Sequence, residues 1–424
     1  MPVTILLVLV ACGLLIATVS QISFAGLRTA RASAYDHAYR RRMQVLHRRT
    51  AQIARLESEI VTPANSKGAV PWRILEVREV VQESADCKSF YLVDPHRQEL
   101  PNYFPGQYLM VRPALASGKQ VTRCYSLSDT PQSDCYRITV KRQQPSETAV
   151  PGSGGLSAYL HDKINPGDCL LIGGPAGQFY LAPDMDTPLV LLAAGIGITP
   201  VVAMLRWSLK HTPNRPILVL FQAKDAIHWP FGRQLHDWQL SCRNLRVVTY
   251  FSGKEQPSSI GNGAMVRIGK FAAKDIVRYL KDPKQSNYYM CGPDSWMTSM
   301  RDGLAVYSVP TSQIHWESFG GTATKKPDAT AKTITDSSAE EFLVNFSLSQ
   351  RQATWSDPEQ SLWELARSND IEIPSGCLSG ACGSCKLRLL NGTVKNSTQA
   401  TAELAEGECL PCVARPSSDL IIEA

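Results

Sequence analysis

Four cysteines near the C-terminus are the residues whose chemistry is clearest. Cys377, Cys382 and Cys385 follow a C-x4-C-x2-C spacing, and Cys412 lies further along the chain. This is the ligand spacing of a plant-type [2Fe–2S] cluster, in which four thiolates hold two bridged iron ions. Glycines within the run let the loop turn back and bring amide N–H groups towards the sulfurs. The spacing predicts a one-electron redox centre, with a zinc site or plain thiols as the alternatives.

A second group of candidate residues lies upstream, where Arg123, Tyr125 and Ser126 follow the strand-like segment Gln107–Arg112. The run Arg-Cys-Tyr-Ser resembles the Arg-x-Tyr-Ser motif of the ferredoxin–NADP reductase superfamily. The resemblance implies that Arg123 neutralises a flavin phosphate and that Tyr125 packs against the isoalloxazine ring. It also implies a catalytic role for Ser126, whose hydroxyl would reach the reactive N5 edge of the flavin.

Gly154, Gly155 and Ser157 open a short helical pattern and resemble the second phosphate motif of that superfamily. Glycines that precede a helix place backbone N–H groups and the positive end of the helix dipole at a bound pyrophosphate. Because a pyrophosphate links riboflavin to adenosine in FAD, the element favours FAD over FMN as the cofactor.

A nucleotide-binding loop is predicted where the apolar run 189–194 ends. Gly195, Gly197, Thr199 and Pro200 follow that run and precede the helical pattern Val201–Leu209. An apolar run without alternation predicts a strand that is buried on both faces. Strand, glycine turn and helix in this order are the setting of a nucleotide phosphate site.

Two later segments complete the resemblance to the superfamily. Cys291 and Gly292 stand in a Cys-Gly-Pro run that lies beside the nicotinamide in that family, although Cys291 could also be a buried core thiol. Glu317 and Phe319 resemble the closing segment of the family, whose Glu and aromatic residue lie near the flavin. The resemblance thus implies that Cys291 and Glu317 belong to the catalytic site.

Residues 70–424 as a whole resemble the flavin–NAD–[2Fe–2S] reductases, which supply electrons to bacterial oxygenases, hydroxylases and desaturases. The segment 125–231 also resembles the reductase part of flavohaemoglobins. Within the ferredoxin module, Cys-x-Ala-x-Pro matches the last ligand of the family, which favours Cys412 over Cys409 as the fourth ligand. The module order argues against the Na⁺-translocating quinone reductase subunit, which places its ferredoxin first.

The pattern predicts a multidomain α/β and β protein. Its parts are a transmembrane anchor (1–27), a basic juxtamembrane helix and linker (28–70), an antiparallel FAD-binding barrel (71–182), a parallel α/β NAD(P)-binding domain (183–320), a flexible linker (321–340) and a β-grasp [2Fe–2S] ferredoxin domain (341–424). The barrel strands are expected at Trp72–Val80, Ser89–Val93, Gln107–Arg112, Arg137–Arg142 and Asp168–Gly173. The parallel strands are expected at Leu189–Ala193, Ile217–Gln222, Arg246–Tyr250 and Asn287–Cys291, and the ferredoxin helix at Ser361–Asn369.

The N-terminal segment predicts a single membrane helix. Residues 1–27 carry no charged side chain, and 5–24 are mostly apolar, which is about the 20 residues that span a bilayer. A signal peptide is the alternative, but the basic residues follow the apolar run. By the positive-inside rule the domains then face the cytoplasm, which places the chain in the inner membrane. The helix at 28–60 could lie on lipid, pair with a second copy or act as a spacer.

Together these features predict an electron-transfer reductase that carries electrons from NADH to FAD, to the cluster and to a partner protein. The anchor suggests a membrane di-iron desaturase or hydroxylase, and a Rieske oxygenase or cytochrome P450 is also possible; nothing suggests nucleic acid. A terminal oxidoreductase acting on a quinone or ferric chelate is the rival, and a redox sensor is a weaker one. Lys224 stands alone beside Asp225 after the second parallel strand, which favours NADH and leaves NADPH possible. The histidines His161, His228 and His236 are expected at the surface or in packing.

Overall fold

The computed structural model describes only part of the chain: residues 40, 43, 44, 47, 50–56, 72–113, 122–143, 155–182, 187–253, 265–319, 341–358, 360–371, 373, 380, 383, 385–397 and 404–424. Its internal contacts divide the chain into two units, Met1–Ser58 and Glu59–Ala424. In the first unit, residues 50–56 are helical. Among the described residues no helix is long and apolar enough to span a bilayer. The predicted anchor at 1–27 and the linker at 321–340 lie outside those residues.

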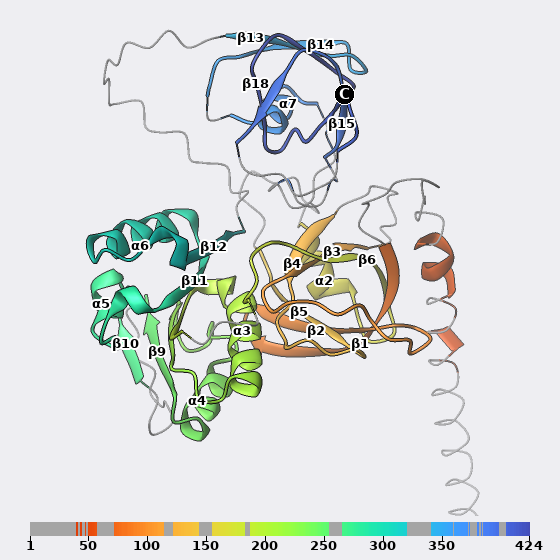
Figure 1. Cartoon of the computed structure of the whole chain (residues 1–424). Helices are drawn as coiled ribbons and strands as arrows, with labels where there is room; N and C mark the ends of the chain where they lie inside the picture. Colours follow the sequence, from red (N-terminus) through yellow and green to blue (C-terminus); the bar gives the residue numbers. More distant parts are fainter. Residues whose placement is uncertain are drawn as a thin grey trace, which may run out of the picture. The chain divides into compact units, whose positions relative to one another are not determined.

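An antiparallel sheet forms the first domain of the second unit (Figure 1). Its strands are β1 (Trp72–Ser84), β2 (Cys87–Val93), β3 (Tyr108–Arg112), β4 (Arg123–Ser126), β5 (Tyr136–Lys141) and β6 (Cys169–Ala176). They lie in the order β4-β3-β6-β1-β2-β5, and a bridge between Leu127 and Ile138 joins the two ends of the sheet. Alternate residues of these strands fill one apolar core. The predicted antiparallel barrel is confirmed.

A parallel sheet forms the second domain. Its strands are β7 (Leu189–Ala194), β8 (Ile217–Ala223), β9 (Leu245–Phe251), β10 (Met265–Ile268), β11 (Asn287–Gly292) and β12 (Ile314–Ser318), in the order β10-β9-β8-β7-β11-β12. The helices are α3 (Ile198–His211), α4 (Gly232–Ser241), α5 (Ala273–Val277) and α6 (Asp294–Val306), with the short 3₁₀ turns η1 (Gly195–Gly197), η2 (Pro283–Gln285) and η3 (Thr311–Gln313).

Two separate apolar cores explain why the parallel strands read as unbroken apolar runs. Leu189 and Leu191 of β7 pack on one side with residues of α3 and α4, whereas Val190 and Leu192 pack on the other side with residues of α5 and α6. Both faces of the sheet are therefore covered, as parallel sheets require. The predicted parallel α/β domain is confirmed.

The third domain is a mixed sheet that packs on one helix. Its strands are β13 (Phe342–Phe346), β14 (Arg351–Trp355), β15 (Leu387–Asn391), β16 (Val394–Asn396), β17 (Glu408–Cys409), β18 (Ala414–Pro416) and β19 (Leu420–Ile422). Five of them form the order β14-β13-β19-β15-β17, and β16 pairs with β18. Helix α7 (Leu362–Ser368) is capped reciprocally by Ser361 and Glu364, and it lies within the predicted 361–369.

His161 illustrates how one helix is attached to the barrel. It lies on α2 (Leu156–Lys163), is 9% exposed, and has its Nε2 2.8 Å from the carbonyl oxygen of Val140 on β5. Its ring also meets the ring of Phe90 edge-on. Burial lowers the pKa of His161, and the nearby charges of Lys88 and Arg142 lower it further. The prediction that His161 serves packing fits these contacts.

We therefore expect His161 to make the barrel acid-sensitive. Because the folded state disfavours the protonated ring, its contribution to stability is complete above the unfolded pKa of about 6.5 and falls as the pH drops below that value. His161→Gln keeps a hydrogen-bond donor for Val140 but does not titrate. The temperature at which flavin fluorescence is released should fall less between pH 7.5 and 5.5 in this variant than in the parent protein. His211→Gln, an exposed site, is the control; an equal effect of both substitutions would contradict the assignment.

Candidate functional site

The predicted flavin residues lie on strand β4 at one end of the barrel sheet. Tyr125 and Ser126 pair with Leu109 and Tyr108 of β3, which fixes the face that each side chain presents. Ser126 is 4% exposed, and its hydroxyl oxygen has no hydrogen-bond partner among the described residues. A buried hydroxyl without a partner is costly unless a ligand completes it. The site therefore fits a bound flavin that offers Ser126 a polar edge.

The other two predicted flavin residues, Tyr125 and Arg123, differ in their surroundings. Burial raises the pKa of Tyr125, so the phenol stays neutral and can pack against an aromatic ring. Arg123 is exposed, and its Nη1 donates a 2.8 Å hydrogen bond to the carbonyl oxygen of Thr122. That arrangement leaves the rest of its guanidinium for a phosphate.

Helix α2 supplies the second half of the predicted flavin site. Gly155 is its N-cap, and a Cβ at this position would meet no atom within 4 Å, so the space in front of the helix is open. No acidic residue lies in the first turn, whereas His161 and Lys163 lie in the last turn, so the positive end of the helix dipole is left for an anion. The hydroxyl of Ser157, unlike the open space at Gly155, is already engaged: it accepts a 3.2 Å hydrogen bond from the backbone N–H of Gln143. Gly154 lies outside the described residues.

The predicted nucleotide loop connects β7 to α3. Gly195 has φ +58°, a conformation that favours glycine, and a Cβ there would meet nothing within 4 Å. At Gly197 a Cβ would lie 2.0 Å from the carbonyl oxygen of Cys291, so only glycine fits. Thr199 is buried and donates a 3.0 Å hydrogen bond to the carbonyl oxygen of Ile196, which closes the turn. Pro200 lies in the first turn of α3, where no N–H is needed.

Strand register brings the remaining predicted residues to the same edge of the sheet. In the parallel ladders Cys291 of β11 pairs with Ala193 of β7 and with Glu317 of β12. The strands thus end together beside Gly195, and ligands of such sheets bind at the carboxyl ends of strands. Gly292 is tightly packed, since a Cβ there would lie 2.9 Å from that of Ala194.

Cys291 is the most enclosed of the predicted catalytic residues. It has 0% exposure, and burial raises its pKa well above the ordinary value, with the charges of Glu317 and Asp294 acting in the same direction. The thiol is therefore neutral, and it can shape a nicotinamide site but not act as a nucleophile. Glu317 is half-buried, whereas Phe319 is 44% exposed just past β12.

Two of the four predicted cluster ligands fall within the described residues. Cys385 and Cys412 are both buried in the third domain, and their Sγ atoms lie 3.1 Å apart, which exceeds the disulfide bond length of about 2.05 Å. Cys377 and Cys382 lie outside the described ranges, and within those ranges no group of three His, Cys, Asp or Glu side chains could hold a metal ion. Two adjacent buried sulfurs are the donors that iron–sulfur chemistry requires.

Cys409, the competing candidate, has a different position. It lies on β17 opposite Leu387 and is 1% exposed. Burial, with a smaller contribution from the neighbouring Cys385, raises its pKa to about 12. The assignment of the fourth ligand to Cys412 stays a prediction, supported by the distance between Cys385 and Cys412.

Comparisons with known proteins find three domain families in this chain. An oxidoreductase FAD-binding domain matches residues 74–180, an oxidoreductase NAD-binding domain matches 191–302, and a 2Fe-2S iron-sulfur cluster binding domain matches 346–417. The flavohemoprotein of Halalkalibacterium halodurans is 31% identical over 254 residues, which are 60% of this chain and 61% of that protein. The chain thus spans about three fifths of the length of that relative.

Two solved structures are also similar. The FAD/NAD-binding domain of the nitric oxide dioxygenase from Vibrio cholerae is 26% identical with a TM-score of 0.51, and the match covers 60% of this chain and 100% of that one. Phthalate dioxygenase reductase, described as a modular structure for electron transfer from pyridine nucleotides to [2Fe–2S], is 25% identical with a TM-score of 0.52. That match covers 83% of this chain and 98% of that chain.

Replacement of the two candidate fourth ligands tests the cluster site. Cys412→Ser should remove the visible absorption of the [2Fe–2S] centre, because a hydroxyl is a poorer iron ligand than a thiolate. Cys409→Ser is the matched control, since Cys409 is also buried, and it should leave that absorption in place. The opposite result would reassign the fourth ligand to Cys409.

Asp225 tests coenzyme choice, because it follows β8 at the edge of the nucleotide loop. Its Oδ1 accepts hydrogen bonds from the backbone N–H groups of Ile227 (3.1 Å) and His228 (2.9 Å) and lies 2.7 Å from His228 Nδ1. Burial alone would raise the pKa of Asp225, but the hydrogen bonds from His228 bring it below the ordinary value, so the carboxylate is charged at neutral pH. A fixed negative charge there opposes a 2′-phosphate.

We expect NADH to exceed NADPH in kcat/KM by about tenfold or more, which is about 1.4 kcal/mol. Asp225→Asn keeps an oxygen for the turn but removes the charge, and should reduce that preference by a factor of about 3 to 10, since one such repulsion is worth about 1 kcal/mol. Asp237→Asn, on the exposed face of α4, should leave the ratio unchanged. A preference for NADPH in the parent protein would refute this account of the turn.

Proposed function

Because this chain belongs to the flavin, NAD and [2Fe–2S] reductases of the ferredoxin–NADP reductase superfamily, we propose that it supplies electrons from NADH to a partner oxygenase, hydroxylase or desaturase at a membrane. It is an NAD(P)H-dependent electron-transfer oxidoreductase with FAD and a [2Fe–2S] cluster. The observation that carries the proposal is the set of modules. The chain shares nearly the whole length of phthalate dioxygenase reductase, a protein that moves electrons from pyridine nucleotides to [2Fe–2S].

The described side chains hold and orient these groups. A bound flavin would supply hydride acceptance and release of single electrons, and a bound cluster would supply one-electron transfer. Ser126 would offer its buried hydroxyl to the flavin edge, and the open N-terminus of α2 would hold the pyrophosphate. The loop at Gly195–Gly197 would receive the pyridine nucleotide beside the buried Cys291. No general acid or base is needed for a hydride transfer.

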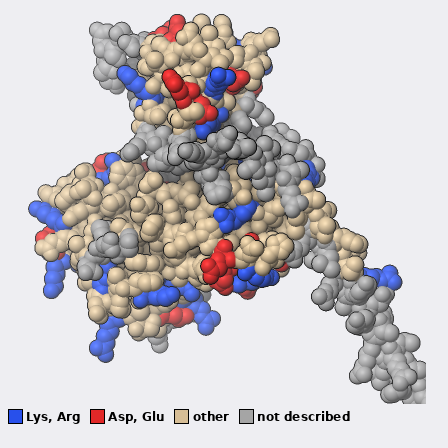
Figure 2. Space-filling model, turned by 45° about the vertical axis from the view of Figure 1, so that its right-hand side comes forward, with Lys and Arg blue, Asp and Glu red and all other residues tan. Residues whose placement is uncertain are grey.

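The charge of the ferredoxin module bears on the kind of partner that it would meet. Residues 341–424 contain six Lys and Arg against eleven Asp and Glu, and an acidic electron-transfer module suits a basic docking face. Figure 2 shows acidic and basic side chains side by side on the face of this domain that is turned to the viewer. Lys386 and Glu408 of the same domain form an ion pair at 3.1 Å. Docking would therefore combine overall electrostatic attraction with a specific pattern of charges, and would not depend on a uniformly acidic patch.

We infer the location from the N-terminal sequence. An uncharged segment of 27 residues followed by seven arginines within 28–49 supports a single anchor with the domains in the cytoplasm. An acceptor in the same membrane would gain from a raised effective concentration. This favours a membrane di-iron desaturase or hydroxylase, with a Rieske oxygenase or cytochrome P450 as further members of the acceptor class.

A cluster-free variant tests the proposal. In Cys382→Ser, NADH should still bleach the flavin and reduce ferricyanide, while reduction of cytochrome c and of an acceptor in native membranes should fall by at least about tenfold, because one-electron delivery passes through the cluster. Stopped-flow absorbance and steady-state turnover with and without membranes measure both arms. Cys409→Ser is the control.

Two outcomes would contradict the proposal. If the flavin of Cys382→Ser is no longer reduced by NADH, the modules do not act in series. If quinone or ferric-chelate reduction is fast, independent of membranes and untouched by Cys382→Ser, the chain is a terminal reductase for small acceptors.

A further inference from the structure

A buried carboxylate lies where the barrel meets the nucleotide domain. Asp129 follows the flavin residue Ser126 by three positions and is 4% exposed. Its Oδ2 lies 3.6 Å from Nε of Arg137 on β5, and its Oδ1 accepts a hydrogen bond from Nη1 of Arg206 on α3. One arginine therefore comes from the barrel and the other from the nucleotide domain.

Asp129 is itself held rigidly. Its Oδ1 accepts a 2.7 Å hydrogen bond from the backbone N–H of Thr130, and its carbonyl oxygen accepts a 2.9 Å hydrogen bond from the hydroxyl of Tyr103. Arg137 is also buried and donates a hydrogen bond to the carbonyl oxygen of Ser128. A carboxylate fixed from two sides by its own domain is a defined point to which another domain can attach.

Other contacts join the two domains around this point. The guanidinium carbon of Arg137 lies 5.0 Å from the ring centre of Phe231, which precedes α4. A Cβ at Gly106 would lie 2.5 Å from Cε of Met204 on α3, so glycine permits the helix to approach the barrel. These contacts are apolar or weakly directional, whereas the bond between Arg206 and Asp129 fixes a direction.

Helix α3 links the hydrogen bond between Arg206 and Asp129 to the nucleotide loop. Thr199 and Pro200 lie in the first turn of the helix beside the nucleotide loop, and Arg206 lies on the same helix about two turns later. Asp129 thus connects the strand that carries Ser126 to the helix whose first turn follows Gly197. We propose that Asp129 and Arg206 are positioning residues that set the approach of the nicotinamide to the flavin for hydride transfer. The proposal rests on the proposed function above.

Arg206 is the better residue to change. Its side chain is 38% exposed, so Arg206→Ala leaves no buried cation, and the pair of Asp129 and Arg137 stays intact. Misplacement of reacting groups by about 1 Å can cost about a hundredfold in rate. We therefore expect Arg206→Ala to lower the limiting rate of flavin reduction by NADH about tenfold to a hundredfold. Flavin content and the Kd for NAD⁺ should stay within about twofold of the parent, because neither ligand touches Arg206 in this assignment.

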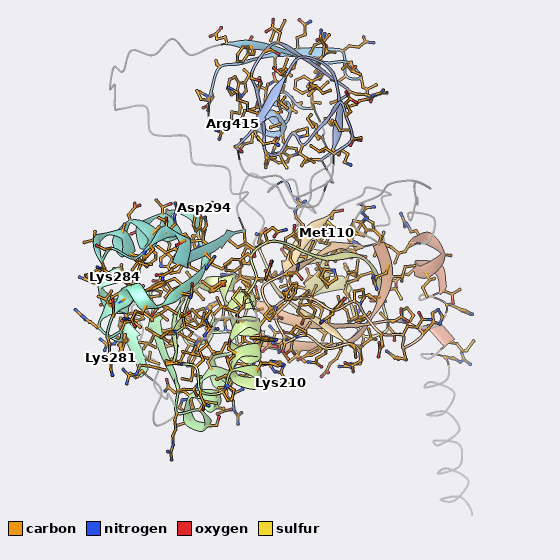
Figure 3. All side chains as sticks on the ribbon, in the orientation of Figure 1. Met110, Lys210, Lys281, Lys284, Asp294 and Arg415 are labelled. Atoms are coloured by element: carbon orange, nitrogen blue, oxygen red, sulfur yellow. The ribbon has the colours of Figure 1, made fainter. Side chains whose placement is uncertain are left out.

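The measurement is anaerobic stopped-flow reduction of the full-length holoenzyme with NADH and with 4-deuterated NADH. The variant should show a larger primary isotope effect, which general loosening of the fold would not produce, and Arg206→Lys should recover most of the lost rate. Lys210→Ala is the matched control, since Lys210 lies one turn further on α3 and is exposed (Figure 3).

The inference fails if Arg206→Ala slows flavin reduction no more than Lys210→Ala does. It also fails if the variant releases its flavin, because the contact would then hold the barrel rather than place the nucleotide. Absence of flavin reduction by NADH in the parent protein would instead overturn the proposed function. Asp129→Asn also leaves the buried Arg137 without its carboxylate, so it should slow flavin reduction at least as much as Arg206→Ala, and Arg206→Ala should add nothing in the Asp129→Asn background.

Discussion

The parallel register of β7, β11 and β12 is the constraint on which the nucleotide site depends. Parallel strands that are covered on both faces must be apolar throughout, so polar chemistry can begin only where the strands stop. The register places Ala193, Cys291 and Glu317 side by side, one residue before their strands end. The glycine turn, the buried thiol and the half-buried carboxylate therefore meet without any dedicated loop to gather them.

Much of this could be predicted from the sequence because the motifs are local. The turn at Gly195–Gly197 and the helix α7 each depend on neighbours within a few residues, and α7 lies within the expected 361–369, whereas the helix after the glycine turn begins at Ile198 rather than at the expected Val201. Strand ends were less predictable. The first strand continues to Ser84, beyond the expected Val80, because its hairpin with β2 pairs up to Cys87, and that pairing is set by the turn.

The contact between Asp129 and Arg206 could not be predicted in this way. The two residues are 77 positions apart, and no spacing rule connects a residue after a barrel strand with the middle of a helix in another domain. The placement of Asp129, three residues after Ser126, was the only available signal. Similarly, the sequence favoured Cys412 over Cys409 only by family resemblance, whereas the distance to Cys385 is a property of the folded third domain.

The close approach at Gly197 also has an evolutionary consequence. The carbonyl oxygen of Cys291 occupies the space that any side chain at position 197 would need, and backbone atoms cannot be exchanged by substitution. Position 197 is therefore closed to single-step change, while Gly195, which faces open space, is limited only by its backbone conformation. Relatives that differ in coenzyme or partner would have to keep glycine at position 197. We therefore expect sequence differences among them to lie in the turns away from this close contact between the loop and β11.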